Sequence, residues 1–284
     1  MLLTVNTTDA RAVESRVIDD FRYLFAGTPS DAITRSFASV ERYFRGEDPE
    51  YLPIDARYHD LEHTLQGTLT LSALLRGRAD SGVGPQLQRE DFEQAILAIL
   101  MHDTGYLKQH DDVTGTGAKY TFTHVQRSCD FAAAVLARQG YVPLQILGIQ
   151  NMIRCTGLES VATHIQFQSE TERVAGHALG TADLLGQMAA SDYPEKLPFL
   201  YQEFREAVDF SGGHGNSTGF SSVQDLMEKT PGFWRHYVLP KFETEFAGLY
   251  HCLDQRIGGT MTNPWVEAVE ANLRRLEPHL AART

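Results

Sequence analysis

Apolar residues recur every three or four positions along most of the chain, which is the pattern of amphipathic helices. The first two runs are Val13, Val17, Phe21, Leu24 and then Ile33, Phe37, Val40, Phe44. The same spacing predicts further helices over 58–76, 91–102, 123–139, 143–155, 171–189, 195–210, 232–255 and 264–280. The predicted fold class is therefore all-α.

Helix ends and loops are marked by glycine and proline. Glycines follow several of the periodic runs, where a left-handed residue would end a helix, and prolines stand where first turns are expected. Alternation over 161–167 fits a short strand or an extended loop, and 111–121 and 211–219 are expected to be surface loops. No internal repeat or break in composition divides the chain, so one large helical domain is expected.

Composition narrows the class of protein and its partners. The 284 residues include 25 basic and 37 acidic side chains, so the formal net charge is −12, and 42% of residues are hydrophobic. This is an ordinary globular composition, and its negative charge argues against a nucleic acid polymer or an anionic membrane as partner. Three cysteines without a C-x-x-C pair and an N-terminus without a signal-like apolar run favour a soluble, cytoplasmic protein.

An unusual helix end provides the first candidate chemistry. The segment 94–101 is apolar on every face and runs directly into His102 and Asp103. A carboxylate there meets the negative end of the helix dipole and loses hydration, so a positive partner is expected. A lysine or arginine would serve, and so would a divalent metal ion held by both His102 and Asp103.

Two other segments offer ligands of the same kind. His59 and His63 are four residues apart at the start of a predicted helix, hence on one face of it, and Asp183 lies inside an apolar helix where an unpaired carboxylate would be costly. Each has an ordinary explanation, a satisfied histidine or a salt bridge. One shared metal site would account for all three segments.

The ordered motifs Tyr58-His59-x-x-x-His63, His102-Asp103-x-Gly105 and Ala182-Asp183 resemble those of the HD superfamily of metal-dependent phosphohydrolases. More narrowly, they resemble the class I cyclic nucleotide phosphodiesterases. The resemblance covers residues 58–188 and implies an HD-like helical bundle with extra helices at both ends. It divides the chain into an N-terminal helical extension (1–57), a metal-binding catalytic core (58–190) and C-terminal helices packing on the same domain (191–284).

Carried over residue by residue, the resemblance implies that His63, His102, Asp103 and Asp183 are metal ligands, with Asp103 bridging to a second ion. His59 matches the general acid, flanked by Tyr58, and Asp60 or Glu62 could orient an imidazole. One or two divalent ions (Mn, Mg, Zn, Fe or Ni) would bind the phosphate and activate a water as hydroxide, and His59 would protonate the leaving alkoxide.

Other positions help to choose a branch of the family. His124 starts a predicted helix and is either a contact for the second metal or the phosphate, or a helix residue without chemistry. Thr156 stands where branches with a fully protein-ligated second metal have histidine, which implies a mostly water-ligated second ion. Asp60 replaces the asparagine usual in the phosphodiesterases, Gly157 supplies no acid, and no substrate-gripping glutamine can be placed, so cyclic nucleotide specificity is not implied.

The predicted function is a phosphodiesterase acting on a small nucleotide-like phosphoester, with a nucleotide phosphomonoesterase as the nearest variant. Two alternatives stay open: a di-iron oxygenase of the same superfamily, and a catalytically silent binding module stabilised by metal. The expected partner is a small-molecule phosphoester, and the oligomeric state is left open.

Overall fold

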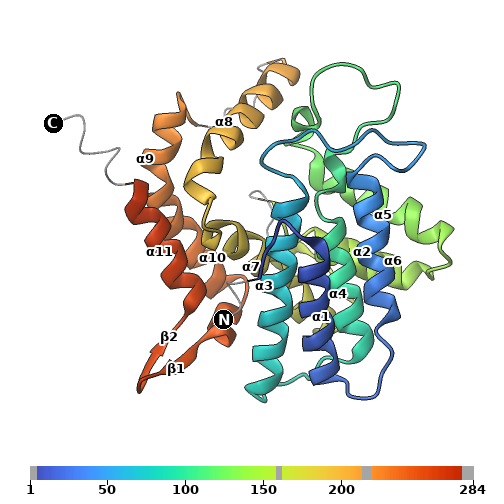
Figure 1. Cartoon of the computed structure of the whole chain (residues 1–284), viewed down its shortest axis with the longest axis vertical. Coiled ribbons are helices and arrows are strands. Elements are labelled where there is room, and N and C mark those ends of the chain that lie inside the picture. The colour runs from blue at the N-terminus through green and yellow to red at the C-terminus, as the bar shows by residue number, and fades with distance from the viewer. Residues whose placement is uncertain (1–4, 158–161, 213–218, 277–284) are drawn as a thin grey trace.

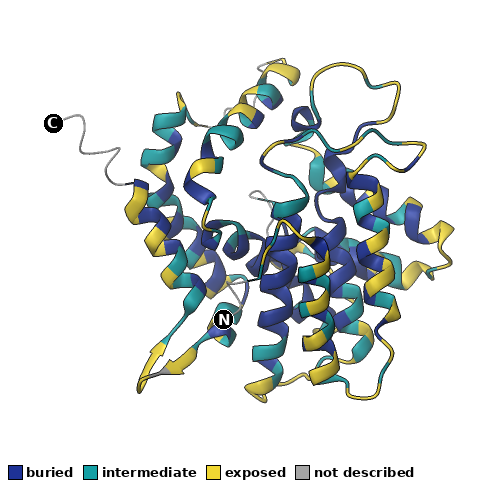
Figure 2. Ribbon diagram, in the orientation of Figure 1, coloured by how far each residue is buried: buried dark blue, intermediate teal, exposed yellow. Residues whose placement is uncertain are grey.

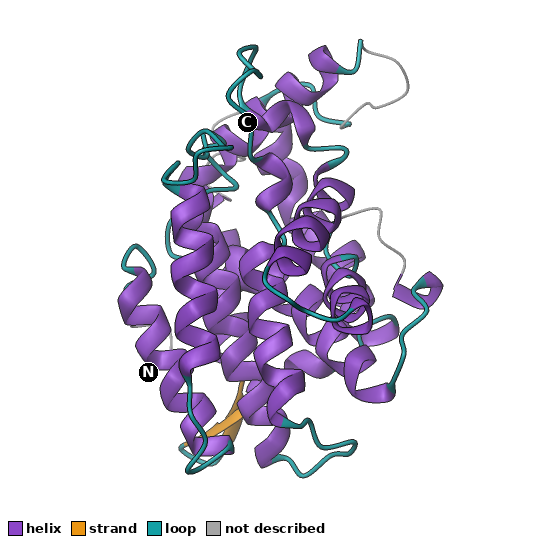
Figure 3. Ribbon diagram, turned by 90° about the vertical axis from the view of Figure 1, so that its right-hand side faces the viewer, coloured by secondary structure: helices purple, strands orange, loops and turns teal. Residues whose placement is uncertain are grey.

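The computed structural model describes residues 5–157, 162–212 and 219–276, and helices make up most of it (Figure 1). The all-α prediction is confirmed. Within the described residues, no helix is both long and apolar enough to cross a lipid bilayer. The turned view in Figure 3 shows the helices packed in more than one layer, with a small hairpin at one end.

Two 20-residue helices, α3 (Leu61–Asp80) and α7 (Glu170–Ala189), pack against each other at the centre and make the most extensive helix contact of the fold. Most of their residues are buried, which Figure 2 shows in dark blue. Glycine allows the close approach, because a Cβ on Gly186 would lie 2.9 Å from the Gln66 carbonyl oxygen. The two central helices therefore form a rigid frame.

Helices surround this pair on both sides (Figure 1). On one side lie α1 (Ala10–Leu24), α2 (Asp31–Phe44), α4 (Arg89–Met101), α5 (His124–Arg138) and α6 (Pro143–Ile153). On the other side lie α8 (Tyr193–Phe210), α9 (Val223–Phe233), α10 (Leu239–Thr244) and α11 (Pro264–Leu276). α4 is buried over its last seven residues, as its all-apolar sequence predicts, and it contacts both α3 and α7.

The buried side chains form one hydrophobic cluster that runs from Ala10 to Leu276. Trp265 of α11 is 1% exposed, and its indole Nε1 donates a hydrogen bond to Thr70 Oγ1 of α3 at 3.0 Å. The last helix thus packs directly on the central frame. The three-part division of the chain remains a prediction, because a shared core does not place its boundaries.

The prediction of one helix over 232–255 is wrong. The chain instead continues α9 through a π-helical turn (Trp234–Val238) into α10, and then forms a 3₁₀ turn (Leu249–Leu253). Pro231 and Pro240 lack the amide hydrogen that a regular helix needs, and Ala247 and Gly248 adopt positive φ angles of 55° and 65°. The spacing of apolar residues alone does not indicate where the helix is interrupted.

A small antiparallel hairpin, β1 (Gln255–Ile257) and β2 (Thr260–Thr262), was not predicted. Its turn is Gly258-Gly259, with φ angles of 58° and 88°, a recognised hairpin signal. In the alternating stretch 161–167, Ala162–His164 forms a 3₁₀ turn, and residues 158–161 lie outside the described part. The loop 111–121 contains a short 3₁₀ helix (Gly117–Tyr120), and residues 213–218 of the second expected loop lie outside the described part.

Candidate metal centre

Three helices bring the four predicted ligands together. His63 is in the first turn of α3, where Asp60 caps the helix and accepts a hydrogen bond from the His63 amide at 2.9 Å. His102 and Asp103 follow the last residue of α4, and Asp183 is in the middle of α7. All four are buried, with at most 7% of the residue exposed. The fold therefore brings residues from three distant parts of the sequence into one buried region.

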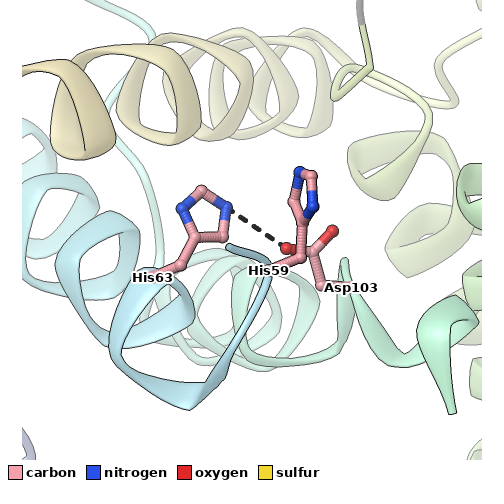
Figure 4. Close-up of side chains that lie close together, drawn as sticks. All are labelled: His59, His63 and Asp103. Atoms are coloured by element: carbon pink, nitrogen blue, oxygen red, sulfur yellow. Dashed lines mark ion pairs between the residues drawn. The ribbon is translucent and has the colours of Figure 1, made fainter. Parts of the chain in front are cut away.

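The donor atoms form a compact group. His63 Nε2 lies 3.2 Å from Asp103 Oδ2 and 3.4 Å from Asp183 Oδ1, and His102 Nε2 lies 3.2 Å and 3.3 Å from the same two oxygens. Figure 4 shows His63 and Asp103 pointing toward each other, with His59 beside them. A cation bound at about 2.0–2.2 Å keeps neighbouring donors about 3.0–3.4 Å apart. The nitrogen–oxygen spacing therefore fits ligands of a shared ion. The donors fall into two overlapping groups that could hold a metal ion, one of which consists of His63, His102 and Asp183.

Hydrogen bonding supports the same conclusion. His102 Nδ1 lies 2.7 Å from the Ile99 carbonyl oxygen, so this nitrogen carries the hydrogen in the neutral ring and Nε2 carries the lone pair. His102 Nε2 and Asp103 Oδ2 are buried without a hydrogen-bond partner. Two inward-facing lone pairs are costly unless a cation or a proton lies between them. The cluster could hold a metal ion, as its composition of imidazoles and carboxylates also suggests.

Electrostatics shows how strongly the cluster attracts positive charge. Burial acts to lower the pKa of His63, but Asp103 and Asp183 outweigh it and raise the pKa to about 9. The same carboxylates raise the pKa of His102 well above its usual value, again against burial. Burial acts to raise the pKa values of Asp103 and Asp183, but the imidazoles lower both. Without metal, protons on the imidazoles therefore take the place of the cation.

His59 reaches the cluster in a different way from the one predicted. α3 begins at Leu61, so His59 precedes the helix and does not share a helical face with His63. The two imidazoles are nevertheless close, with ring centroids 5.4 Å apart. His59 also belongs to a second group of three residues, with His63 and Asp103, that could hold a metal ion.

The carboxylate that orients His59 is Glu203, not Asp60 or Glu62. Glu203 Oε2 lies 2.6 Å from His59 Nδ1, and Glu203 Oε1 accepts a hydrogen bond from the Tyr58 amide at 2.6 Å. Asp60 and Glu62 instead form salt bridges with Lys196 of α8, each at 3.3 Å. The His59 ring is therefore held through Nδ1, and Nε2 is the nitrogen left to act on another molecule.

Glu203 was missed because its contact with His59 spans 144 residues and no local spacing links them. Tyr106 was also missed, although it stands close to the His102-Asp103 motif. Its ring lies nearly parallel to both imidazoles, with centroid distances of 4.5 Å to His59 and 4.8 Å to His124. Tyr58, predicted to flank His59, lies edge-on to it at 5.0 Å and donates a hydrogen bond from its hydroxyl to Gln187 at 2.7 Å.

His124 lies at the edge of the same group, as the first residue of α5. Its Nε2 is 3.8 Å from Asp103 Oδ1, the carboxylate oxygen turned away from His63, and its Nδ1 lies 2.6 Å from the Thr121 carbonyl oxygen. Burial lowers the pKa of His124. In the neutral ring Nδ1 carries the hydrogen, so Nε2 bears a lone pair near the second oxygen of Asp103 and could help to hold a second cation, but it has no hydrogen to donate to an anion.

A cavity of about 980 Å³ opens beside the cluster. His59, His63, Asp103 and Asp183 are among the residues that line it. His124, Arg154 and Thr156 line it as well; Arg154 donates a hydrogen bond to Asn151, and Thr156 donates one to the Ile153 carbonyl. The cluster therefore faces a space large enough for a small molecule.

The fold and the site define an all-α protein with a buried group of histidine and aspartate side chains that could hold a metal ion. The chain belongs to the Npun_R2479-like family, whose model matches residues 109–261, slightly more than half of the chain. The matched region contains His124, Asp183 and Glu203, whereas His59, His63, His102 and Asp103 precede it. A search of the curated proteins found no match.

Proposed function

We propose that the protein is a metal-dependent phosphohydrolase of the HD type, acting on a small phosphoester. The observation that carries the proposal is the group of His63, His102, Asp103 and Asp183, in which imidazole and carboxylate atoms lie 3.2–3.4 Å apart beside a cavity. His59 lies directly beside this group. A divalent cation bound there supplies Lewis acidity toward a phosphate and lowers the pKa of a nearby water.

The side chains then divide the remaining work. His59 donates a proton from Nε2 to the oxygen of the leaving alcohol, while Glu203 holds the ring through Nδ1. Arg154 lines the same cavity, and its guanidinium can donate hydrogen bonds to phosphate oxygens. Burial of the four donors excludes competing water from the ligand side of the cluster.

The decisive experiment measures metal content and hydrolysis together. Protein purified without added metal is analysed for its elements, then loaded with Mn²⁺ and assayed on phosphodiesters, phosphomonoesters and cyclic nucleotides. We expect at least one divalent ion per chain and hydrolysis of a phosphoester. Iron with dioxygen consumption and no hydrolysis would instead indicate an oxygenase, and bound metal with no turnover would indicate a binding module.

Asp103→Ala is expected to abolish metal loading and turnover and to lower thermal stability, because ligand and fold are coupled. The matched control is Asp111→Ala. Asp111 belongs to a second His-Asp pair, His110-Asp111, which lies exposed in a loop. Metal content in Asp103→Ala equal to that of the control would refute the ligand assignment.

A further inference from the structure

Part of the wall of this cavity is formed by apolar faces of three helices. α7 contributes Leu184 and Met188, one turn apart, and α8 contributes Leu197, Leu200 and Phe204, at the spacing of one helical face. α9 completes the wall with a face that contains Leu226 and Phe233. We call this part the apolar arm.

Two polar side chains of α9 that line the cavity are already engaged with the protein. The Thr230 hydroxyl donates to the Leu226 carbonyl oxygen of its own helix at 2.8 Å. The ammonium of Lys229 donates to the Gly219 carbonyl oxygen at 2.8 Å and to the Asp225 carboxylate. Phe220 stacks on Phe204, with ring centroids 5.9 Å apart. This wall therefore offers mainly apolar contact surface.

Consecutive residues connect the arm to the candidate metal site. On α7, Asp183 belongs to the histidine and aspartate cluster, and the next residue, Leu184, lines the cavity. On α8, Glu203 holds His59 and Phe204 lines the arm. A molecule with its phosphate at the cluster would therefore have a neighbouring group extending along the arm.

We propose that this group is a hydrocarbon, so that the substrate is the phosphoester of an aliphatic alcohol, alkyl or prenyl in character. This inference rests on the proposed function. The volume of about 980 Å³ is at the upper end of the range for small-molecule sites, enough for a phosphate and an extended chain. In hydrolysis the bond between phosphorus and the alcohol oxygen breaks, a bond from phosphorus to the water oxygen forms, and His59 gives the alcohol its proton. The water keeps one hydrogen on the new phosphate and releases the other to solvent, from which His59 regains its proton.

The test measures binding separately from turnover. Isothermal titration of wild-type protein loaded with Mn²⁺ is carried out with straight-chain alkylphosphonates, from butyl- to decylphosphonate, which cannot be hydrolysed. Each added methylene is expected to strengthen binding about fourfold until the arm is full. The heat capacity change should become more negative along the series, because apolar surface is being buried. Equal affinity at all lengths would overturn the inference.

Variants locate the effect in the arm. Phe204→Gln should reduce the gain per methylene, and Leu200→Trp should shorten the longest chain that still gains affinity. The control is Phe210→Gln, on the same helix, because Phe210 is 59% exposed and should leave the series unchanged. If Phe204→Gln fails to fold, the chain-length series measured on Leu200→Trp and on the wild-type protein still tests the inference. A series unchanged in Leu200→Trp would place the hydrocarbon elsewhere and overturn the inference.

Failure of the inference and failure of the proposed function give different results. If short phosphoesters are hydrolysed but chain length has no effect on binding, the hydrocarbon substrate is wrong and the phosphohydrolase stands. If binding rises with chain length but no alkyl phosphoester is hydrolysed, the arm binds hydrocarbon as proposed and the reaction is wrong.

Discussion

At the scale of single residues, two of the imidazoles are oriented by contacts through Nδ1. His102 Nδ1 contacts the Ile99 backbone carbonyl, and His59 Nδ1 contacts the Glu203 carboxylate. Such partners set which ring nitrogen faces inward. The chemistry of these two imidazoles therefore follows from a contact that lies outside the cluster itself.

Replacing His59 tests its role as acid. His59→Gln is expected to retain the metal and to lower kcat by about 10²–10⁴-fold, the usual contribution of a general acid. Metal content and kcat are measured on the same preparation. If the ion is lost instead, His59 is a ligand and belongs to the second group that it forms with His63 and Asp103.

Glu203 is a positioning residue, and its replacement should act through His59. Glu203→Gln is expected to lower kcat by about 10–100-fold while KM and metal content stay close to wild type. Glu206→Gln provides the control, because Glu206 lies one turn along α8 and accepts hydrogen bonds from Thr116 instead. Equal kcat in the two variants would show that Glu203 does not position the acid.

The pKa of His63 predicts how pH affects the metal-free protein. The pKa is raised from 6.5 to about 9, so the stabilisation is fully present below about pH 6.5 and is lost as the pH rises to about 9. A shift of this size corresponds to up to about 3 kcal/mol. Unfolding by urea in EDTA between pH 6 and pH 9.5 should show this fall, and saturating Mn²⁺ should remove it. A flat profile in EDTA would contradict the coupling.

At the scale of elements, the helices that could be predicted are those with one buried face, because burial repeats with the helical turn. The candidate site at the end of α4 could also be predicted, because His102 and Asp103 directly follow an apolar helix. The position of His59 could not be predicted, because helix periodicity does not show that Asp60 is the cap. The contact between Glu203 and His59 could not be predicted for a different reason. It depends on how α8 packs against the rest of the fold, and no local sequence pattern shows this.

Gly105 lies where the segment after α4 packs closely against the start of α5. A Cβ at this position would lie 2.0 Å from the carbonyl oxygen of His124. Gly105→Ala should therefore destabilise the protein by about 1–3 kcal/mol, as overpacking does, and displace His124. Gly232→Ala in α9 is the control, because its Cβ would meet nothing closer than His236 at 3.9 Å. Denaturant unfolding compares the two, and equal midpoints would contradict a tight junction.

At the scale of the whole molecule, the site draws on nearly the full length of the fold. The candidate ligands lie on α3, directly after α4, and on α7. Glu203, which contacts His59, lies on α8, and α11 packs on the frame through Trp265. A chain restricted to residues 58–190 is therefore expected to lose cooperative unfolding and metal loading. Circular dichroism melts and elemental analysis check this, and a cooperative melt with full metal content would show that the predicted core folds alone.

The meeting of three helices at one point has a kinetic consequence. All three cysteines are free thiols, so the described structure contains no covalent tie between its distant segments. An ion held by His63 and Asp183 closes a long loop of chain, much as a cross-link does. With an ion bound there, separation of α3 from α7 would require the ion to dissociate. The half-life of the folded protein on heating would then depend on the rate of that dissociation.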